Sequence, residues 1–121
     1  MLELRQATKF RDDAGRHWHF RFDTAAIVRA VAAGVDVEQL RSVADWERLR
    51  MTDEGRQLAT MLMFCLVEPL AERRRVTPED FVGGLRESWQ QAYVAMYAAW
   101  GVYELAAKKR KRKAGRWSVR K

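Results

Sequence analysis

Cysteine and long apolar runs are scarce in this sequence, and each scarcity excludes a class of protein. The single cysteine, Cys65, excludes an internal disulfide, and its neighbours Phe64 and Leu66 indicate a core thiol rather than a nucleophile. Apolar stretches such as 58–67 are shorter than the roughly 20 residues that cross a membrane, and the N-terminus lacks the apolar stretch of a signal peptide. We therefore expect a soluble, cytoplasmic protein without membrane contact.

The residue patterns of catalytic and metal sites are also missing. His17 and His19 are the only histidines and share one face of a predicted strand, whereas zinc requires three or four ligands, so we favour a solvated strand face. Gly83 and Gly84 fall inside a predicted helix and are not followed by the Lys and Ser or Thr of a phosphate-binding loop. Acidic pairs occur at turns and helix starts, where capping explains them. We expect no enzyme activity, metal or cofactor.

Positive charge is confined to the end of the chain. The formal net charge is +7, yet residues 1–107 hold 14 Lys or Arg against 16 Asp or Glu, and residues 108–121 hold nine Lys or Arg and no acid. Because like charges repel and apolar periodicity ends near Ala107, the sequence predicts one domain over 1–107 and a disordered basic tail over 108–121.

The first elements of the domain form a β-hairpin, predicted over about 8–22. Asp12 to Gly15 form a turn-type cluster, and the return arm alternates apolar and polar residues. This alternation places Trp18, Phe20 and Phe22 on one face, which must pack against helices because a lone hairpin is only marginally stable.

Helices account for the remainder of the domain. A short helix capped by Asp23 or Thr24 is expected over 25–33, with Ile27, Val28 and Val31 as its apolar stripe. Short helical turns anchored by Trp46 are expected within 36–50. A central helix begins at Thr52 or Asp53, carries apolar residues nearly all round, and should kink or end near Glu68 because Pro69 removes a backbone donor.

Thr77 and Pro78 open the last helix, since a threonine cap, a proline at the first position and two acids are a helix-start pattern. Apolar residues at three- and four-residue steps extend it as one stripe from Phe81 to Leu105. The predicted fold is mainly α: a small helical domain with an N-terminal β-hairpin and a long C-terminal helix.

This last helix carries an aromatic stripe of five residues: Trp89, Tyr93, Tyr97, Trp100 and Tyr103. Such spacing suits a helix that anchors a partner in a groove, because Trp and Tyr dominate interface hot spots. The same rings could instead form core and cover the aromatic face of the hairpin. The stripe spans more of the helix circumference than one core face needs, so both alternatives stay open.

The basic tail suits phosphate backbones, since binding by counterion release requires only charge. Its densest run is Lys108, Lys109, Arg110, Lys111, Arg112 and Lys113. Sequence-specific reading of duplex DNA is not expected, because the slightly acidic body lacks a basic docking face. Non-specific contact with nucleic acid through the tail is therefore one partner prediction.

The order of these elements resembles a known family. A hairpin over 10–18 (FRDDAGRHW) precedes a small helix ending in 33–36 (AGVD), a helix over 62–67 that runs into a proline, and the phrase 75–81 (RVTPEDF) that opens a long helix. Over residues 8–105 this layout is similar to that of the small tail assembly chaperones of tailed bacteriophages and prophages.

The resemblance implies a mostly helical, non-enzymatic protein that binds the long tape measure protein and helps to recruit tail tube subunits. An aromatic and Met-rich surface is an adaptable face that suits such a partner. Homo-oligomerisation stays open. The alternatives are a small nucleic-acid-associated accessory protein that uses its basic tail, and a structural tail or head-completion protein that stays in the virion.

Overall fold

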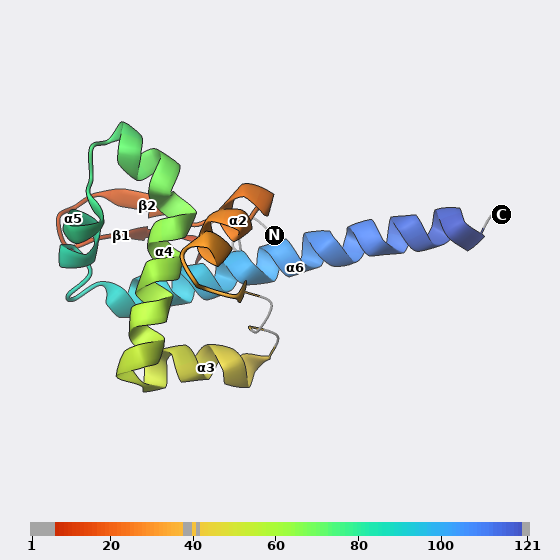
Figure 1. Cartoon of the computed structure of the whole chain (residues 1–121), viewed down its shortest axis with the longest axis horizontal. Coiled ribbons are helices and arrows are strands. Elements are labelled where there is room, and N and C mark those ends of the chain that lie inside the picture. Colours follow the sequence, from red (N-terminus) through yellow and green to blue (C-terminus); the bar gives the residue numbers. More distant parts are fainter. Residues whose placement is uncertain (1–6, 38–39, 41, 120–121) are drawn as a thin grey trace.

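The computed structural model describes the backbone of residues 7–37, 40 and 42–119, and the side chains of these residues up to Lys109. The protein is mainly α-helical, with a two-stranded hairpin and a long C-terminal helix, as the sequence predicts (Figure 1). The elements follow in the order β1 (Lys9–Arg11), β2 (His17–His19), α2 (Thr24–Ala32), α3 (Val43–Met51), α4 (Asp53–Arg73), α5 (Pro78–Gly83) and α6 (Trp89–Val119). Helix α4 packs against α2, α3, α5 and α6, and α6 also packs against β1.

The hairpin is antiparallel and places Phe10 opposite Trp18. Its aromatic face is buried as predicted, whereas both histidines of β2 are exposed. The ring of Phe10 stacks on Phe20 with centroids 5.0 Å apart, and the indole of Trp18 meets the edge of Phe81 in α5 at 5.4 Å. Helices therefore supply the packing that an isolated hairpin lacks.

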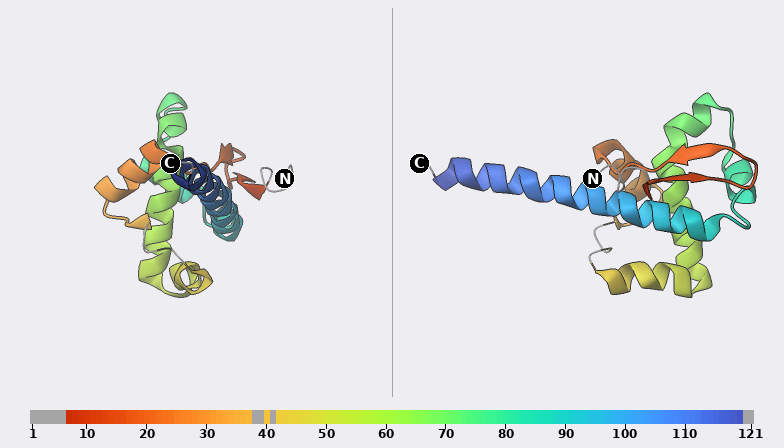
Figure 2. Two further views of the ribbon diagram at one scale, coloured as in Figure 1. Left: turned by 90° about the vertical axis from the view of Figure 1, so that its right-hand side faces the viewer. Right: turned by 180° about the vertical axis from the view of Figure 1, so that it is seen from behind.

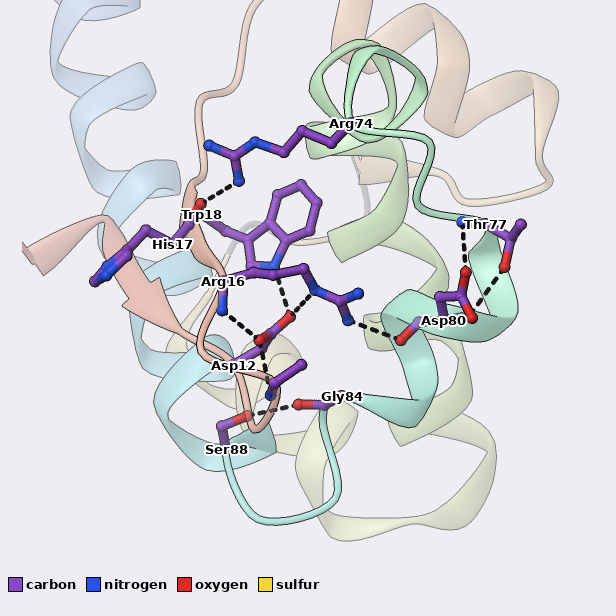
Figure 3. Close-up of polar contacts among 10 residues, drawn as sticks. Asp12, Arg16, His17, Trp18, Arg74, Thr77, Asp80, Gly84 and Ser88 are labelled. Carbon is purple, nitrogen blue, oxygen red and sulfur yellow. Dashed lines mark hydrogen bonds and ion pairs between the residues drawn. The ribbon is translucent and has the colours of Figure 1, made fainter.

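The carboxylate of Asp12 is the buried polar centre of this packing (Figure 3). One oxygen accepts hydrogen bonds from the backbone N–H groups of Ala14 and Arg16, at 3.0 and 2.9 Å. The other accepts from Nε of Arg16 at 2.8 Å and from the indole N–H of Trp18 at 2.9 Å. Burial by itself would raise the pKa of Asp12, but these hydrogen bonds outweigh it and hold the pKa below its ordinary value.

The hairpin turn is bonded to the segment that joins α5 to α6. The carbonyl of Gly84 accepts hydrogen bonds from the backbone N–H of Asp13 and from the hydroxyl of Ser88. The side chain of Asp13 accepts from the backbone N–H of Glu87 at 2.9 Å, and Arg16 donates to the carbonyl of Asp80 at 3.0 Å. A Cβ at Gly84 would lie 2.9 Å from the Arg16 guanidinium, so a larger residue here would have to displace the Arg16 side chain from its bonds to Asp12 and Asp80.

These contacts correct the prediction of one continuous stripe from Phe81 to Leu105. The capping box of Thr77 and Asp80 starts α5 at Pro78, as predicted, but α5 ends at Gly83 and α6 begins only at Trp89. Glycines lower the cost of leaving the helix, and the hairpin turn satisfies the backbone groups that the break would otherwise leave without partners.

The face that helix α2 buries overlaps only in part with the one predicted. Its cap at Asp23 is confirmed, and Ile27 packs against the core, but Val28 and Val31 are 61% and 58% exposed, whereas Ala26 and Ala30 are buried. Small alanine side chains let the α2 backbone approach α4 closely, and that close approach leaves the larger valines facing away from the core.

Helix α3 is anchored by Trp46, as predicted. The side chain of Trp46 is 2% exposed, and a capping box between Ser42 and Asp45 begins the helix. Residues 38, 39 and 41, which belong to the predicted helical turns, lie outside the described part of the chain.

The central helix was predicted to kink or end near Glu68. It does not end there, because α4 continues through Pro69 to Arg73. Proline lacks the N–H that would reach the carbonyl four residues earlier, at Cys65. Nε of Arg29 in α2 donates to that carbonyl at 2.9 Å. A tertiary hydrogen bond thus replaces the missing helical one.

Helix α6 leaves the body and extends well beyond it (Figures 1 and 2). Its backbone is helical through Val119, where the sequence predicted a disordered tail from Lys108. Lys, Arg and Ala are good helix formers, and extending an existing helix by one residue needs no new nucleation. The predicted mobility of the tail stays a prediction.

We predict that Asp12→Asn lowers the free energy of unfolding by about 2–3 kcal/mol at pH 7, because it removes the charge from hydrogen bonds in a buried site. The folded pKa of Asp12 lies below its ordinary value of 3.8, so its contribution is complete above that pH and is lost as the pH falls through the folded pKa. Urea unfolding from pH 7 to pH 2 measures this. Glu72→Gln, an exposed change on α4, is the control, and equal pH profiles for wild type and Asp12→Asn would contradict the assignment.

A double-mutant cycle tests whether Arg29 takes the place of the backbone N–H that Pro69 lacks. Arg29→Met should cost about 1–2 kcal/mol of stability, because it leaves the Cys65 carbonyl without a donor. In a Pro69→Ala background the restored N–H supplies the bond, so the same change should cost less than about 0.5 kcal/mol. Arg73→Met is the matched control in both backgrounds. Additive costs in urea unfolding would show that the two sites are independent.

Candidate functional site

A groove of about 840 Å³ runs along one face of α4. The α4 residues that line it recur at the spacing of a single helix face: Arg56, Gln57, Thr60, Met61, Phe64, Cys65 and Glu68. At 1.5 Å per residue this face is about 18 Å long, or about three helical turns. Helix α2 supplies the lining residues Arg29 and Ala33, and the opposite lining residues are Pro78, Val82, Leu85, Arg86 and Trp89.

The groove presents apolar side chains that the fold leaves uncovered. Met61 is 43% exposed and Val82 is 50% exposed, while Phe64 is half-buried between them and the core. The ring of Phe64 meets Phe81 at 5.7 Å, so the floor of the groove is continuous with the packed interior. An apolar concavity of this kind is typical of a site for another chain.

One end of the groove is fixed by contacts between α4 and α6. The indole N–H of Trp89 donates to the hydroxyl of Thr60 at 3.0 Å, and that hydroxyl donates to the carbonyl of Arg56 at 2.8 Å. The guanidinium of Arg56 lies 4.6 Å from the centre of the Trp89 ring, and Tyr93 stacks on the same indole with centroids 5.5 Å apart. This corner is preorganised, because its side chains are held by one another before any partner arrives.

Positive charge surrounds the apolar floor. Arg29, Arg56 and Arg86 line the groove with a single acid, Glu68, and none of the three arginines forms an ion pair with a described residue.

Burial raises the pKa of the Cys65 thiol, and nearby Glu68 raises it further, so the thiol is held protonated. Cys65 is 5% exposed, which confirms the interpretation of a core thiol.

The five predicted partner-binding rings do not form one surface. Trp89 lines the groove, whereas Tyr93 is buried and donates its hydroxyl to the carbonyl of Trp46. Burial raises the pKa of the Tyr93 hydroxyl. Tyr97 is 41% exposed, although its ring still lies 5.2 Å from that of Trp46.

The remaining two rings, Trp100 and Tyr103, are half-buried and pack on Phe22 at 5.1 and 6.4 Å. Tyr93 is therefore part of the core, which was one of the two alternatives for these rings. Of the aromatic face of the hairpin, the stripe covers Phe22 alone among the ring contacts described. Binding of a partner by the exposed parts of the stripe stays a prediction.

A second hollow of about 610 Å³ lies between the hairpin and α6, with Lys9, His19, Arg21 and Tyr103 among its lining residues. Burial lowers the pKa of His19, and the charges of Lys9 and Arg21 lower it further. Of the predicted electrostatic tail, Lys108 and Lys109 are exposed on α6, while the side chains of 110–113 lie outside the described part of the chain.

Sequence reasoning missed the groove although the pattern contained a signal for it. Apolar residues nearly all round α4 indicate more apolar surface than one core contact can cover, and Met61 belongs to that excess. Which part stays uncovered depends on where α2 and α5 pack, and sequence periodicity does not give that placement.

Among the residues that the structure describes, no three His, Cys, Asp or Glu side chains gather where they could hold a metal ion. None of the described helices combines the length and the hydrophobicity required to span a bilayer. No protein-family model, curated protein or solved structure matches this chain.

Proposed function

We propose that this protein is a non-enzymatic tail assembly chaperone of a bacteriophage or prophage, which binds a helical segment of the tape measure protein in the α4 groove. The observation that carries the proposal is the uncovered apolar face of α4, which is lined on both sides and is about three helical turns long. The layout of elements over residues 8–105, which is similar to that of the chaperone family, supports the same conclusion.

The groove suits the chemistry of this task. A tape measure protein is long, helix-rich and apolar, so it aggregates unless its apolar stripes are covered. Met61 offers a flexible, polarisable side chain, and Phe64 and Trp89 offer large apolar areas, so the groove can accept stripes of differing shape. One copy covers about three turns, and several copies along the tape measure protein would keep it soluble while tube subunits are recruited.

A second candidate function is non-specific binding of nucleic acid by the C-terminal part of α6. It is favoured by a backbone that is helical through Val119 and leaves the body, in a segment whose sequence from 108 to 121 holds nine Lys or Arg and no acid (Figure 2). In this alternative the body positions a basic helix against phosphates, and affinity comes from counterion release.

Co-expression with the tape measure protein of the same tail gene cluster tests the first function. The wild-type chain should co-purify with it and keep it soluble, and Met61→Glu should weaken binding at least about tenfold, because it places a charge on the apolar floor. Val94→Glu is the matched control, since Val94 is 52% exposed on α6 outside the groove. Unaltered binding by Met61→Glu would show that the binding site lies outside the groove. Failure of the wild-type chain to co-purify with the tape measure protein would contradict the function.

Deletion of 108–121 separates the two functions. For a chaperone, the truncated body should retain the tape measure protein with an affinity within about threefold of the full chain. For the nucleic-acid alternative, the full chain should bind duplex DNA with an affinity that falls steeply with salt, and the truncated body should lose that binding. Fluorescence anisotropy of labelled DNA at 50 and 200 mM salt, alongside the co-purification, gives both readouts.

A further inference from the structure

We propose that the α4 groove selects a helix whose apolar stripe is flanked by carboxylates, with acidic residues about nine positions apart. This inference rests on the proposed function, because it specifies the chemistry of the segment that the groove takes. Three features of the groove carry it: its length, its apolar floor and the placement of its arginines.

The length and floor define the apolar part of the partner. A face of about 18 Å matches three helical turns, so the partner presents apolar residues at positions i, i+3 or i+4, and i+7. Met61 and Phe64 lie near the middle of the α4 face, and Val82 lies opposite them on α5. Met61 and Val82 are exposed, so a partner helix that covers them removes apolar surface from water, and this burial favours the complex.

The arginines define the charged part of the partner. Arg56 lies over the Trp89 ring at one end of the groove, and Arg29 is fixed towards the other end by its hydrogen bond to the Cys65 carbonyl. Arg86 also lines the groove, and Glu68, its one acid, follows Cys65 by three residues on α4. Arg56 and Cys65 are nine residues apart on α4, which corresponds to about 13 Å. A partner helix that lies along α4 meets both ends with carboxylates separated by a similar number of residues.

The charge at the groove is local rather than a property of the whole domain. Residues 1–107 carry 14 basic and 16 acidic side chains, so the body is slightly acidic, whereas the groove has three arginines and one glutamate. This arrangement disfavours the chain's own basic segment 108–121 as an occupant, because three arginines and one glutamate would face nine Lys or Arg. An acidic amphipathic helix of another protein is the occupant that complements it.

Two of the three arginines are held in place before binding. The guanidinium of Arg29 is tied to α4, and that of Arg56 lies over the Trp89 ring, so little side-chain freedom is lost when a carboxylate pairs with them. Such preorganisation makes these pairs stronger than mobile surface ion pairs.

Three labelled helical peptides test the proposal, with one apolar stripe in common and with Glu, Gln or Lys at two flanking positions nine residues apart. Fluorescence anisotropy with the full chain at 50 mM NaCl should show the Glu peptide binding about tenfold more tightly than the Gln peptide, and the Lys peptide binding weakest. At 300 mM NaCl the preference for Glu should shrink to about twofold or less.

Variants of the chain locate the preference. Arg56→Gln combined with Arg86→Gln should reduce the advantage of Glu over Gln from about tenfold to about threefold, because Arg29 remains beside the Cys65 carbonyl. The readout is the ratio of the two affinities, so any change in overall affinity from the altered contact with Trp89 affects both peptides alike. Arg73→Gln combined with Arg75→Gln removes the same charge from exposed positions outside the groove and should retain the advantage. Circular dichroism confirms that both double variants are folded.

The outcomes separate this inference from the function on which it rests. Equal affinities for the Glu and Gln peptides, both abolished by Met61→Glu, would overturn the acidic preference and leave the groove as a binding site. A preference for Glu that stays at about tenfold in the Arg56 and Arg86 double variant would overturn the assignment to this groove. Failure of all peptides together with failure to retain the tape measure protein would overturn both proposals.

Discussion

The buried carboxylate of Asp12 is the interaction on which the arrangement of the other elements depends. Its four hydrogen bonds fix the hairpin turn and the Trp18 indole, and Arg16 carries the connection on to the Asp80 carbonyl in α5. The hairpin turn also forms hydrogen bonds with backbone groups between α5 and α6, and these bonds allow the chain to leave the helix after α5. Because α5 forms one side of the groove, the position of that side follows from a charge buried in a hairpin turn.

A second tertiary bond fixes the other side of the groove. Pro69 leaves the Cys65 carbonyl without its helical donor, and Arg29 reaches across from α2 to supply one. The same side chain lines the groove, so Arg29 both completes the hydrogen bonding of α4 and is a candidate binding residue. The apolar floor between these two sides is the uncovered face of α4, and its chemistry is the basis for the proposed chaperone function.

Local sequence signals predicted most of the elements and few of their contacts. The hairpin, the caps at Asp23, Thr52 and Thr77, and the anchor at Trp46 follow from turn residues, capping side chains and periodicity, all of which act over a few residues. The face of α2 that is buried did not follow, because valines favour burial in general whereas close helix approach at this site favours alanine. The break between α5 and α6 was missed for a similar reason, since its backbone partners come from a turn some 70 residues earlier.

By itself the sequence determined a mainly α-helical domain with an N-terminal hairpin, and a charge of +9 in residues 108–121 on a body of −2. These are properties of composition and of short-range spacing. Only the tertiary structure decided that α4 continues past Pro69, that Tyr93 is core while Trp89 lines a groove, and that three arginines surround an apolar floor. Such features depend on which residues distant in the chain meet, and packing and buried hydrogen bonds select those meetings among many that the local pattern permits.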